Sequence, residues 1–382
     1  MAGIYLHIPF CKQACRYCDF FFSVSVRYKT QFVDCLLDEI RLRKQEGVDN
    51  QAETLYLGGG TPSLLNGEEL DRILDVLHRQ YTFGNDAEWT IECNPDDLDR
   101  DYLEGLRKRG FNRISIGIQS FREEDLKLMR RSHTAEQGEM AVLEAARAGF
   151  ENITMDLIYG IPGQTLRHWE ESVSKALSLP LSHLSAYHLT FEPGTVFDHW
   201  RIKNRLSPVS EETSEQMYRL LRDQLEQEGF DHYEISNFAR NGNISEHNMI
   251  YWTGNPYTGY GPSAHSYDGT LRSWNISSLK GYMDGIARDE PVKEVERPNL
   301  TEKYHDYLIT SLRTRWGADP DYIREQFGQE IHACFEKGAE RYLREGTMWL
   351  QEGKVAITPG KWLITDHILR ELFTTGSSKY EF

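Results

Sequence analysis

The chain has 382 residues, of which 39% are hydrophobic, and it carries a formal net charge of −16 at pH 7. This length predicts one large domain with a smaller one, and the apolar fraction is enough to bury a sizeable core. The acidic charge argues against a nucleic-acid partner, which would need a basic surface. The apolar runs are too short for a membrane-spanning helix, although peripheral contact with a membrane stays open.

The N-terminus and the cysteine content bear on the cellular compartment. The first residues contain neither a basic segment nor a long apolar segment, so we expect no signal peptide and a cytoplasmic protein. In a long cytoplasmic chain, six cysteines are poor candidates for disulfides and better candidates for metal or redox chemistry. Three of them, Cys11, Cys15 and Cys18, lie close together near the start of the chain.

Short runs rich in β-branched or aromatic residues alternate with helical segments through the first half of the chain. The runs predict strands at 4–8, 54–58, 89–93, 113–118, 153–159 and 184–191. Between them, residues 28–46 and 134–148 have apolar positions that repeat with a helical period, and Gly149 would end the second helix. Repeated strand–helix alternation predicts an α/β fold with a parallel sheet, either doubly wound or curled into an incomplete barrel.

Chemically distinctive residues follow each predicted strand. In chain order these segments are C-x3-C-x2-C (11–18), GGGTP (58–62), ECNP (92–95), GIQSF (117–121), YGIPGQT (159–165) and EPGT (192–195). Glycine and proline also mark ordinary turns, but the presence of such a segment after all six predicted strands favours a functional site. Because the carboxyl ends of parallel strands meet at one edge of a sheet, we expect these segments to share one face.

The pattern changes beyond residue 230. Residues 231–266 are too rich in Asn and Gly for long helices and too rich in aromatic residues for a disordered linker. A charged segment with two prolines at 287–303 predicts a domain boundary. After it we expect three helices, a hairpin over 347–365 and a last short helix, an order that resembles a winged helix. We therefore predict a core over 1–236, an extension over 237–290 and a small α+β domain over 300–382.

The three clustered cysteines have the chemistry of a metal site. Thiolates suit iron–sulfur clusters and zinc, but structural zinc usually takes two pairs of ligands, and no second C-x2-C pair follows. The spacing also fits one face of a helix, yet Pro9 and the surrounding aromatic residues favour a loop packed around a cofactor. Three thiolates on a four-iron cluster leave one iron open to bind a substrate.

This cysteine motif, with Tyr17 before its last cysteine, resembles that of the radical S-adenosylmethionine (SAM) superfamily. The resemblance implies a partial (β/α)6 barrel and a [4Fe–4S] cluster held by Cys11, Cys15 and Cys18. In that superfamily the open iron is chelated by the amino and carboxylate groups of SAM, and an electron from the cluster cleaves the SAM sulfonium. The resemblance therefore also implies SAM as a cofactor and an electron donor as a partner.

The resemblance further implies a set of SAM contacts along the strand ends. Glycines in the GGGTP segment would let the backbone approach the methionine end of SAM, because they have no Cβ. Carboxylates would accept hydrogen bonds from the cationic and hydroxyl groups of the ligand, as carboxylates do for ribose in dinucleotide sites. The implied SAM-binding residues are Tyr5, Tyr17, Gly59, Gly60, Thr61, Glu92, Gln119, Arg131 and Asp156. Arg130 could serve in place of its neighbour Arg131.

Within the superfamily, the chain resembles the oxygen-independent coproporphyrinogen III oxidase-like family, which includes both dehydrogenases and HemW-type heme chaperones. The dehydrogenases carry a further cysteine two positions after the third, where this chain has Phe20. They also have an extension before the first strand, whereas four residues precede Tyr5 here. Both departures favour the heme chaperones. The alternative is an enzyme that oxidatively decarboxylates two propionates of coproporphyrinogen III.

The sequence HNMIYW at 247–252 matches the H-N-x-x-Y-W motif associated with heme binding in the HemW-type proteins. His247 offers an imidazole for heme iron, Tyr251 and Trp252 offer flat faces for a macrocycle, and Asn248 could orient the histidine. A packed aromatic corner without heme would use the same residues. The resemblance implies a chaperone that binds the cluster, SAM and heme, and delivers heme to an acceptor protein.

Overall fold

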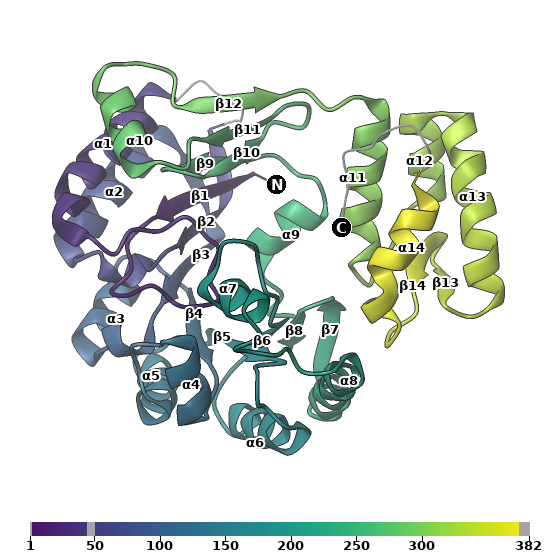
Figure 1. The fold of residues 1–382 in the computed structure, drawn as a ribbon. Coiled ribbons are helices and arrows are strands. Elements are labelled where there is room, and N and C mark those ends of the chain that lie inside the picture. The colour runs from purple at the N-terminus through teal and green to yellow at the C-terminus, as the bar shows by residue number, and fades with distance from the viewer. Residues whose placement is uncertain (1, 44–49, 374–382) are drawn as a thin grey trace.

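The computed structural model of the protein describes residues 2–43 and 50–373, and its centre is a curved sheet (Figure 1). In these residues the sheet has twelve strands in the order β12-β11-β10-β9-β1-β2-β3-β4-β5-β6-β8-β7. Its middle is a run of six parallel strands: β1 (Gly3–Ile8), β2 (Gln51–Gly59), β3 (Thr82–Cys93), β4 (Arg113–Gln119), β5 (Asn152–Tyr159) and β6 (His183–His188). Five predicted strands lie within these bounds, whereas the sixth ends at His188 instead of residue 191.

Helices cover the convex face of this sheet (Figure 1). They are α1 (Lys29–Leu42), α2 (Gly67–Gln80), α3 (Arg100–Lys108), α4 (Glu123–Met129), α5 (Ala135–Arg147), α6 (Leu166–Leu177) and α8 (Glu211–Gln227). Helix α5 matches the predicted helix at 134–148, begins at a Thr134–Gln137 capping box and is followed by Gly149 at φ 90°. Helix α1 matches the predicted helix at 28–46 up to Leu42, and residues 44–46 lie outside the described residues.

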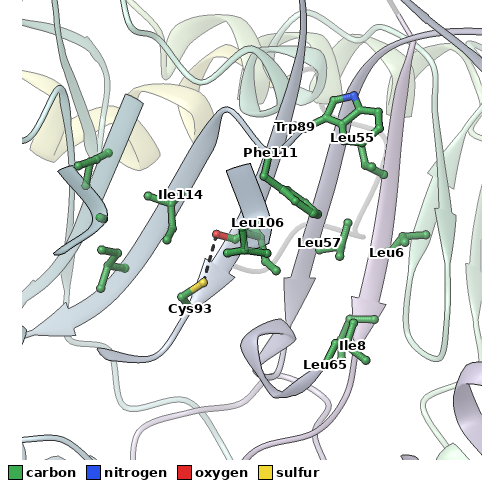
Figure 2. Close-up of a cluster of buried hydrophobic side chains, with 14 of the residues drawn as sticks. Leu6, Ile8, Leu55, Leu57, Leu65, Trp89, Cys93, Leu106, Phe111 and Ile114 are labelled. Carbon is green, nitrogen blue, oxygen red and sulfur yellow. Dashed lines mark hydrogen bonds between the residues drawn. The ribbon is translucent and has the colours of Figure 1, made fainter. Parts of the chain in front are cut away.

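The apolar core lies between the sheet and these helices. Strand residues alternate between two faces, so Leu6, Leu57 and Ile114 point outward and are fully buried (Figure 2). Cys93 lies in the same layer, next to Leu106 of α3. The intervening strand residues face the concave interior, and many of them are polar or aromatic. The same alternation therefore builds both the core and the lining of the interior.

Further strands extend the sheet at both edges. On one side β9 (Tyr257–Tyr260) pairs in parallel with β1, and β10 (His265–Tyr267), β11 (Arg272–Asn275) and β12 (Lys293–Glu296) follow in antiparallel pairing. On the other side β8 (Asn237–Arg240) pairs with β6, and β7 (Phe230–Glu234) pairs with β8. The outermost strands are β12 and β7, so the barrel is incomplete.

The predicted parts 1–236 and 237–290 share this one sheet. Their division falls between β7 and β8 of a single hairpin, and one hydrophobic core contains residues from both parts. Strand β12 also lies inside the charged segment 287–303, where we expected only a boundary. The remaining helices of this region are α7 (Val196–Ile202), α9 (Glu246–Trp252) and α10 (Leu279–Ala287). Short 3₁₀ turns lie at Val26–Tyr28, Pro62–Leu64 and Pro95–Asp97.

The C-terminal residues form a smaller unit with its own hydrophobic core. It consists of α11 (Leu300–Leu312), α12 (Pro320–Phe327), α13 (Gln329–Arg344), β13 (Met348–Gln351), β14 (Lys354–Ile357), a 3₁₀ turn (Trp362–Ile364) and α14 (Thr365–Leu372). This is the predicted order of three helices, a hairpin and a short helix. The unit packs against β7, where the Ile235 amide donates to the Arg313 carbonyl (3.1 Å). Among the described residues, no helix combines the length and apolar character needed to cross a membrane.

Candidate functional site

A cavity of about 420 Å³ lies at the carboxyl ends of the six parallel strands, within the size range of small-molecule sites. All six strands contribute to its lining, either through their carboxyl-terminal residues or through the segments that follow them, as expected for a parallel α/β sheet. The predicted cluster and SAM residues that line it are Cys11, Cys15, Tyr17, Cys18, Gly59, Gly60, Thr61, Glu92, Gln119, Arg131 and Asp156. Tyr5 is the one predicted SAM residue that lies outside this lining.

The three cysteines lie in a loop rather than on a helix. The base of the loop is closed where the Cys11 amide donates to the Ser23 carbonyl (3.0 Å). All three thiols are partly buried and face one cavity. Burial raises the pKa of Cys11 and raises that of Cys18 to about 12, so metal binding would have to displace the thiol protons.

The arrangement of the three thiols fits an iron–sulfur cluster better than it fits a single metal ion. Within 2–43 and 50–373, no three His, Cys, Asp or Glu side chains converge closely enough to hold one metal ion. A mononuclear site needs such convergence, whereas each thiolate of a four-iron cluster binds a different iron. Cys93 points into the core beside α3 and does not complete the set (Figure 2).

The GGGTP turn follows β2 and packs closely against β1. A Cβ on Gly60 would lie 2.8 Å from the carbonyl oxygens of both Ile8 and Phe10. Gly59 has a φ of 104°, and a Cβ there would lie 2.5 Å from the His7 ring. Only glycine allows this approach, which brings the turn beside the base of the cysteine loop. The Thr61 hydroxyl then donates to the Cys11 sulfur (3.5 Å).

Two carboxyl groups line the floor of the cavity. Glu92 accepts hydrogen bonds from the Tyr56 hydroxyl (2.7 Å) and the Gly59 amide (3.1 Å), one on each carboxylate oxygen. Removal from water raises the pKa of Glu92 to about 7, and these two hydrogen bonds oppose the shift. Asp156 accepts from the Ser115 hydroxyl (3.1 Å), and burial raises its pKa. A cationic or hydroxyl-bearing ligand would stabilise the ionised forms of both groups.

The structure distinguishes the two neighbouring arginines. The Arg131 guanidinium enters the cavity and donates to Asn94 Oδ1 (2.7 Å), the Gly117 carbonyl (2.9 Å) and the Cys15 sulfur (3.5 Å). Its buried Nε has no hydrogen-bond partner among the described residues. Arg130, in contrast, is exposed and does not line the cavity. A cavity that holds a buried guanidinium fits a ligand with a carboxylate.

The remaining predicted SAM residues have different surroundings. Gln119 ends β4 at a register shift, and its φ of 67° is unusual for a residue other than glycine. Tyr17 lies against Arg131, and burial raises the pKa of its hydroxyl. Tyr5 faces the barrel interior below the cavity, where its ring stacks on Tyr56 (centroids 6.1 Å apart) and its hydroxyl bonds to His7 Nδ1 (3.2 Å).

Sequence reasoning missed several residues of this site. Tyr56, His7 and Ser115 contact the predicted residues directly, and Asn94 joins Arg131 to Thr61. The alternation of strand residues would have placed Tyr56 and Ser115 on the interior face. Asn94 lies within the ECNP segment that was singled out, but nothing local indicates its partners.

The HNMIYW residues lie at the opposite end of the barrel. Helix α9 packs at the amino ends of the strands, where the His247 amide donates to Glu88 (3.1 Å). One ring nitrogen of His247 bonds to the Thr54 hydroxyl (2.6 Å) and the other to the Tyr251 hydroxyl (2.8 Å). The residue is 1% exposed, and burial lowers its pKa to about 3. In this conformation neither nitrogen is free to bind iron, as a heme ligand would require.

Asn248, Tyr251 and Trp252 are each partly exposed on α9. Tyr251 packs edge-on against Tyr257 (centroids 4.7 Å apart), which fixes its ring beside His247. The motif is therefore partly a packed aromatic corner, the alternative that the sequence left open. Its three partly exposed residues remain accessible to a flat apolar ligand.

Comparison with known proteins identifies the family. A model of the radical SAM superfamily matches residues 5–176, which run from β1 to α6. The heme chaperone HemW of Bacillus subtilis is 34% identical over 361 residues, covering 94% of this chain and 95% of that protein. HemW of Escherichia coli is 32% identical, with 96% and 94% covered. The coproporphyrinogen III oxidase HemN of Escherichia coli, a radical SAM enzyme, superimposes with a TM-score of 0.84 at 25% identity, covering 98% of this chain and 90% of that one. The chain therefore belongs to the HemW family of the radical SAM superfamily.

Proposed function

We propose that this protein is a heme chaperone that binds a [4Fe–4S] cluster, SAM and heme, and delivers heme to an acceptor protein in the cytoplasm. The observation that carries the proposal is the likeness to HemW proteins along almost the whole length of both chains. Membership of the radical SAM superfamily implies the cluster and SAM. The cavity at the carboxyl ends of the strands supplies residues whose chemistry fits both.

The thiols of Cys11, Cys15 and Cys18 would hold the cluster and leave one iron open toward the cavity. When bound, the cluster supplies an electron to the ligand on that iron, and an electron-donor partner restores it. The loop keeps the thiols partly enclosed, and the cavity wall above them is built from the β4, β5 and β6 segments. This enclosure would limit the access of bulk water to a cluster held there.

The chain's own residues would orient SAM by charge. The Arg131 guanidinium would pair with the carboxylate of SAM; in support, its two oxygen acceptors are neutral, and its Nε has no hydrogen-bond partner among the described residues. Glu92 and Asp156 would accept hydrogen bonds from the amino group and the ribose hydroxyls of SAM. The glycines of the GGGTP turn let the ligand approach backbone groups at the edge of β2.

Heme contact is proposed for the partly exposed residues of α9, namely Asn248, Tyr251 and Trp252. Flat aromatic faces at the protein surface suit a macrocycle that is bound reversibly. Iron binding by His247 would require breaking one of its two hydrogen bonds, to Thr54 or to Tyr251. Weak or absent iron ligation would suit a carrier, because the bound heme must be released to the acceptor protein.

A second candidate function is oxidative decarboxylation of coproporphyrinogen III, which the likeness to HemN favours. One side chain weighs against it. Phe20 lies two positions after Cys18, where the coproporphyrinogen dehydrogenases have a further cysteine, and it is 68% exposed at the cavity rim. An exposed phenyl ring there provides neither a thiol nor any other acid, base or hydrogen donor.

Anaerobic turnover separates the two functions. Protein with a reconstituted cluster is mixed with SAM, a reductant and coproporphyrinogen III, and the products are followed by chromatography. In parallel, heme-loaded protein is mixed with apomyoglobin as a surrogate acceptor, and the transfer is followed by absorption spectroscopy. We expect heme transfer and no protoporphyrinogen. Protoporphyrinogen that accumulates over many turnovers would overturn the chaperone proposal.

A further inference from the structure

The interior of the barrel contains a column of aromatic rings between α9 and the cavity. The His247 ring lies nearly parallel to the Tyr56 ring, with centroids 4.9 Å apart and an angle of 24° between their planes. Tyr5 stacks beside both, at 6.1 Å from Tyr56 and 6.3 Å from His247. The rings come from α9, β2 and β1, so the column joins α9, which carries the HNMIYW motif, to two central strands.

The lower end of this column is fixed by hydrogen bonds. Both ring nitrogens of His247 are engaged, by Thr54 of β2 and by Tyr251 one helical turn away. The amides of Glu246 and His247 both donate to the Glu88 carboxylate of β3 (3.1 Å each). An imidazole with two partners and a buried position has no freedom to rotate, so it offers a rigid surface to the Tyr56 ring.

The upper end of the column reaches the cavity. The Tyr56 hydroxyl donates to Glu92 Oε1 (2.7 Å), and the other carboxylate oxygen accepts from the Gly59 amide (3.1 Å). Burial and the charge of Glu92 raise the pKa of Tyr56, so the hydroxyl retains the proton that it donates. The orientation of Glu92 thus depends on where the Tyr56 ring lies, and the ring rests on His247.

From this arrangement we infer that His247 and Tyr56 are positioning residues for SAM, which hold the Glu92 carboxylate in the orientation that receives the ligand. The inference rests on the proposed function, in which Glu92 contacts SAM. It gives the HNMIYW motif a second role, because its histidine acts through the barrel interior on the cavity at the opposite end. Iron ligation would use one ring nitrogen and one hydrogen-bond partner for the other, so it does not account for the second hydrogen bond or for the stacked tyrosine.

The test uses full-length protein with a reconstituted cluster, and measures the Kd of SAM by anaerobic calorimetry and the Kd of heme by absorption. Tyr56→Phe keeps the ring and removes the hydroxyl, and should weaken SAM binding about 10-fold, the scale of one hydrogen bond to a charged group. His247→Ala should weaken SAM binding by a similar factor, and because it also removes the hydrogen bond to Tyr251, the Kd of heme is measured as a separate readout. Tyr260→Phe is the matched control, because it removes another buried hydroxyl, bonded to Tyr81, that is remote from Glu92.

Two further variants separate positioning from a general loss of structure. His247→Phe restores a flat ring without a nitrogen, so it should recover part of the SAM affinity that His247→Ala loses. In a Glu92→Gln background, His247→Ala should have no further effect on SAM binding, because both changes act through the same carboxylate. A merely structural role for His247 would make the two losses additive.

The outcomes distinguish this inference from the proposed function. Unchanged SAM affinity in Tyr56→Phe and His247→Ala, with heme affinity lost in His247→Ala and His247→Phe, would overturn the inference and assign His247 to iron. Wild-type protein that binds heme but not SAM would overturn the inference and leave the carrier function standing. Wild-type protein that binds SAM but not heme would overturn the carrier function, and the variants would still decide the role of His247.

Discussion

At the scale of single residues, the cavity is lined by charged side chains whose observed hydrogen-bond partners are mostly neutral. The Arg131 guanidinium is enclosed by neutral acceptors and a thiol, and Glu92 and Asp156 are bonded to hydroxyl and amide donors. Within residues 2–43 and 50–373, no basic side chain donates a hydrogen bond to either carboxylate. Charged groups held by neutral partners keep much of their capacity to bind a ligand of opposite charge.

This reasoning predicts unequal roles for the two adjacent arginines. Arg131→Gln should weaken SAM binding at least 10-fold, because the cavity loses its cation, and it should also lower the melting temperature through the lost bonds to Asn94 and Gly117. Arg130→Gln is the control, since that side chain is exposed and outside the cavity lining. Calorimetry with the cluster-loaded protein measures both affinities. Equal losses in the two variants would show that Arg131 does not act through contact with the ligand.

The raised pKa of Glu92 predicts a pH dependence of stability in the cluster-free protein. Its pKa is about 7 in the folded protein against an ordinary value of 4.5, so the folded state binds more protons between these values. The contribution of Glu92 to the free energy of unfolding therefore falls as pH rises from 4.5 to about 7. Urea unfolding measured at pH 5 and pH 8 should show that the free energy of unfolding falls less in Glu92→Gln than in wild type. An identical fall in both proteins would contradict the raised pKa.

At the scale of elements, strand alternation and glycine placement determine the site. Each parallel strand presents apolar residues to the helices, and each strand end or the segment after it carries a cavity residue. The GGGTP turn is the tightest of these junctions, because its backbone lies against the backbone of β1 and the start of the cysteine loop. The position of the loop therefore depends on the turn.

Gly60→Ala should impair assembly of the cluster. The added methyl group would lie 2.8 Å from two backbone oxygens, of Ile8 and Phe10, so the cysteine loop must shift and the protein should lose about 1–3 kcal/mol of stability. Iron content after reconstitution should fall to less than half of the wild-type value. Gly84→Ala is the control, because a Cβ there meets nothing within 4 Å. Full iron loading in Gly60→Ala would mean that the turn does not position the loop.

At this scale, the features that could be predicted from the sequence are those whose pattern lies within one short stretch of the chain. The cysteine spacing, the glycine turn and the strand runs are each contained in fewer than ten residues, and the structure has the strands where the runs predicted them. The pairing of β9 with β1 and the bond from Thr54 to His247 were not predictable. The second of these joins positions 193 residues apart, and only the folded barrel brings them together. The sixth strand was overextended because apolar residues continue past His188, where the chain turns over the cavity.

At the scale of the whole molecule, the barrel separates the two proposed ligand regions. The cavity lies at the carboxyl ends of the strands, and α9 lies at their amino ends, beside the C-terminal unit (Figure 1). The aromatic column and Glu92 are the contacts that join them through the interior. This separation could not be derived from the motifs alone, because their order along the chain does not show at which end of a strand each one lies.

Because the two regions are separate, SAM and heme should bind together rather than compete. Titrating heme into cluster-loaded protein should give one site per chain both without SAM and at saturating SAM. The column allows a modest coupling between SAM binding and heme binding. By thermodynamic linkage, the factor by which SAM changes the heme Kd must equal the factor by which heme changes the SAM Kd. Trp252→Ala should weaken heme binding and leave SAM binding unchanged, since this side chain lies on α9 outside the column. A heme Kd that rises in proportion to SAM concentration would place both ligands in the one cavity.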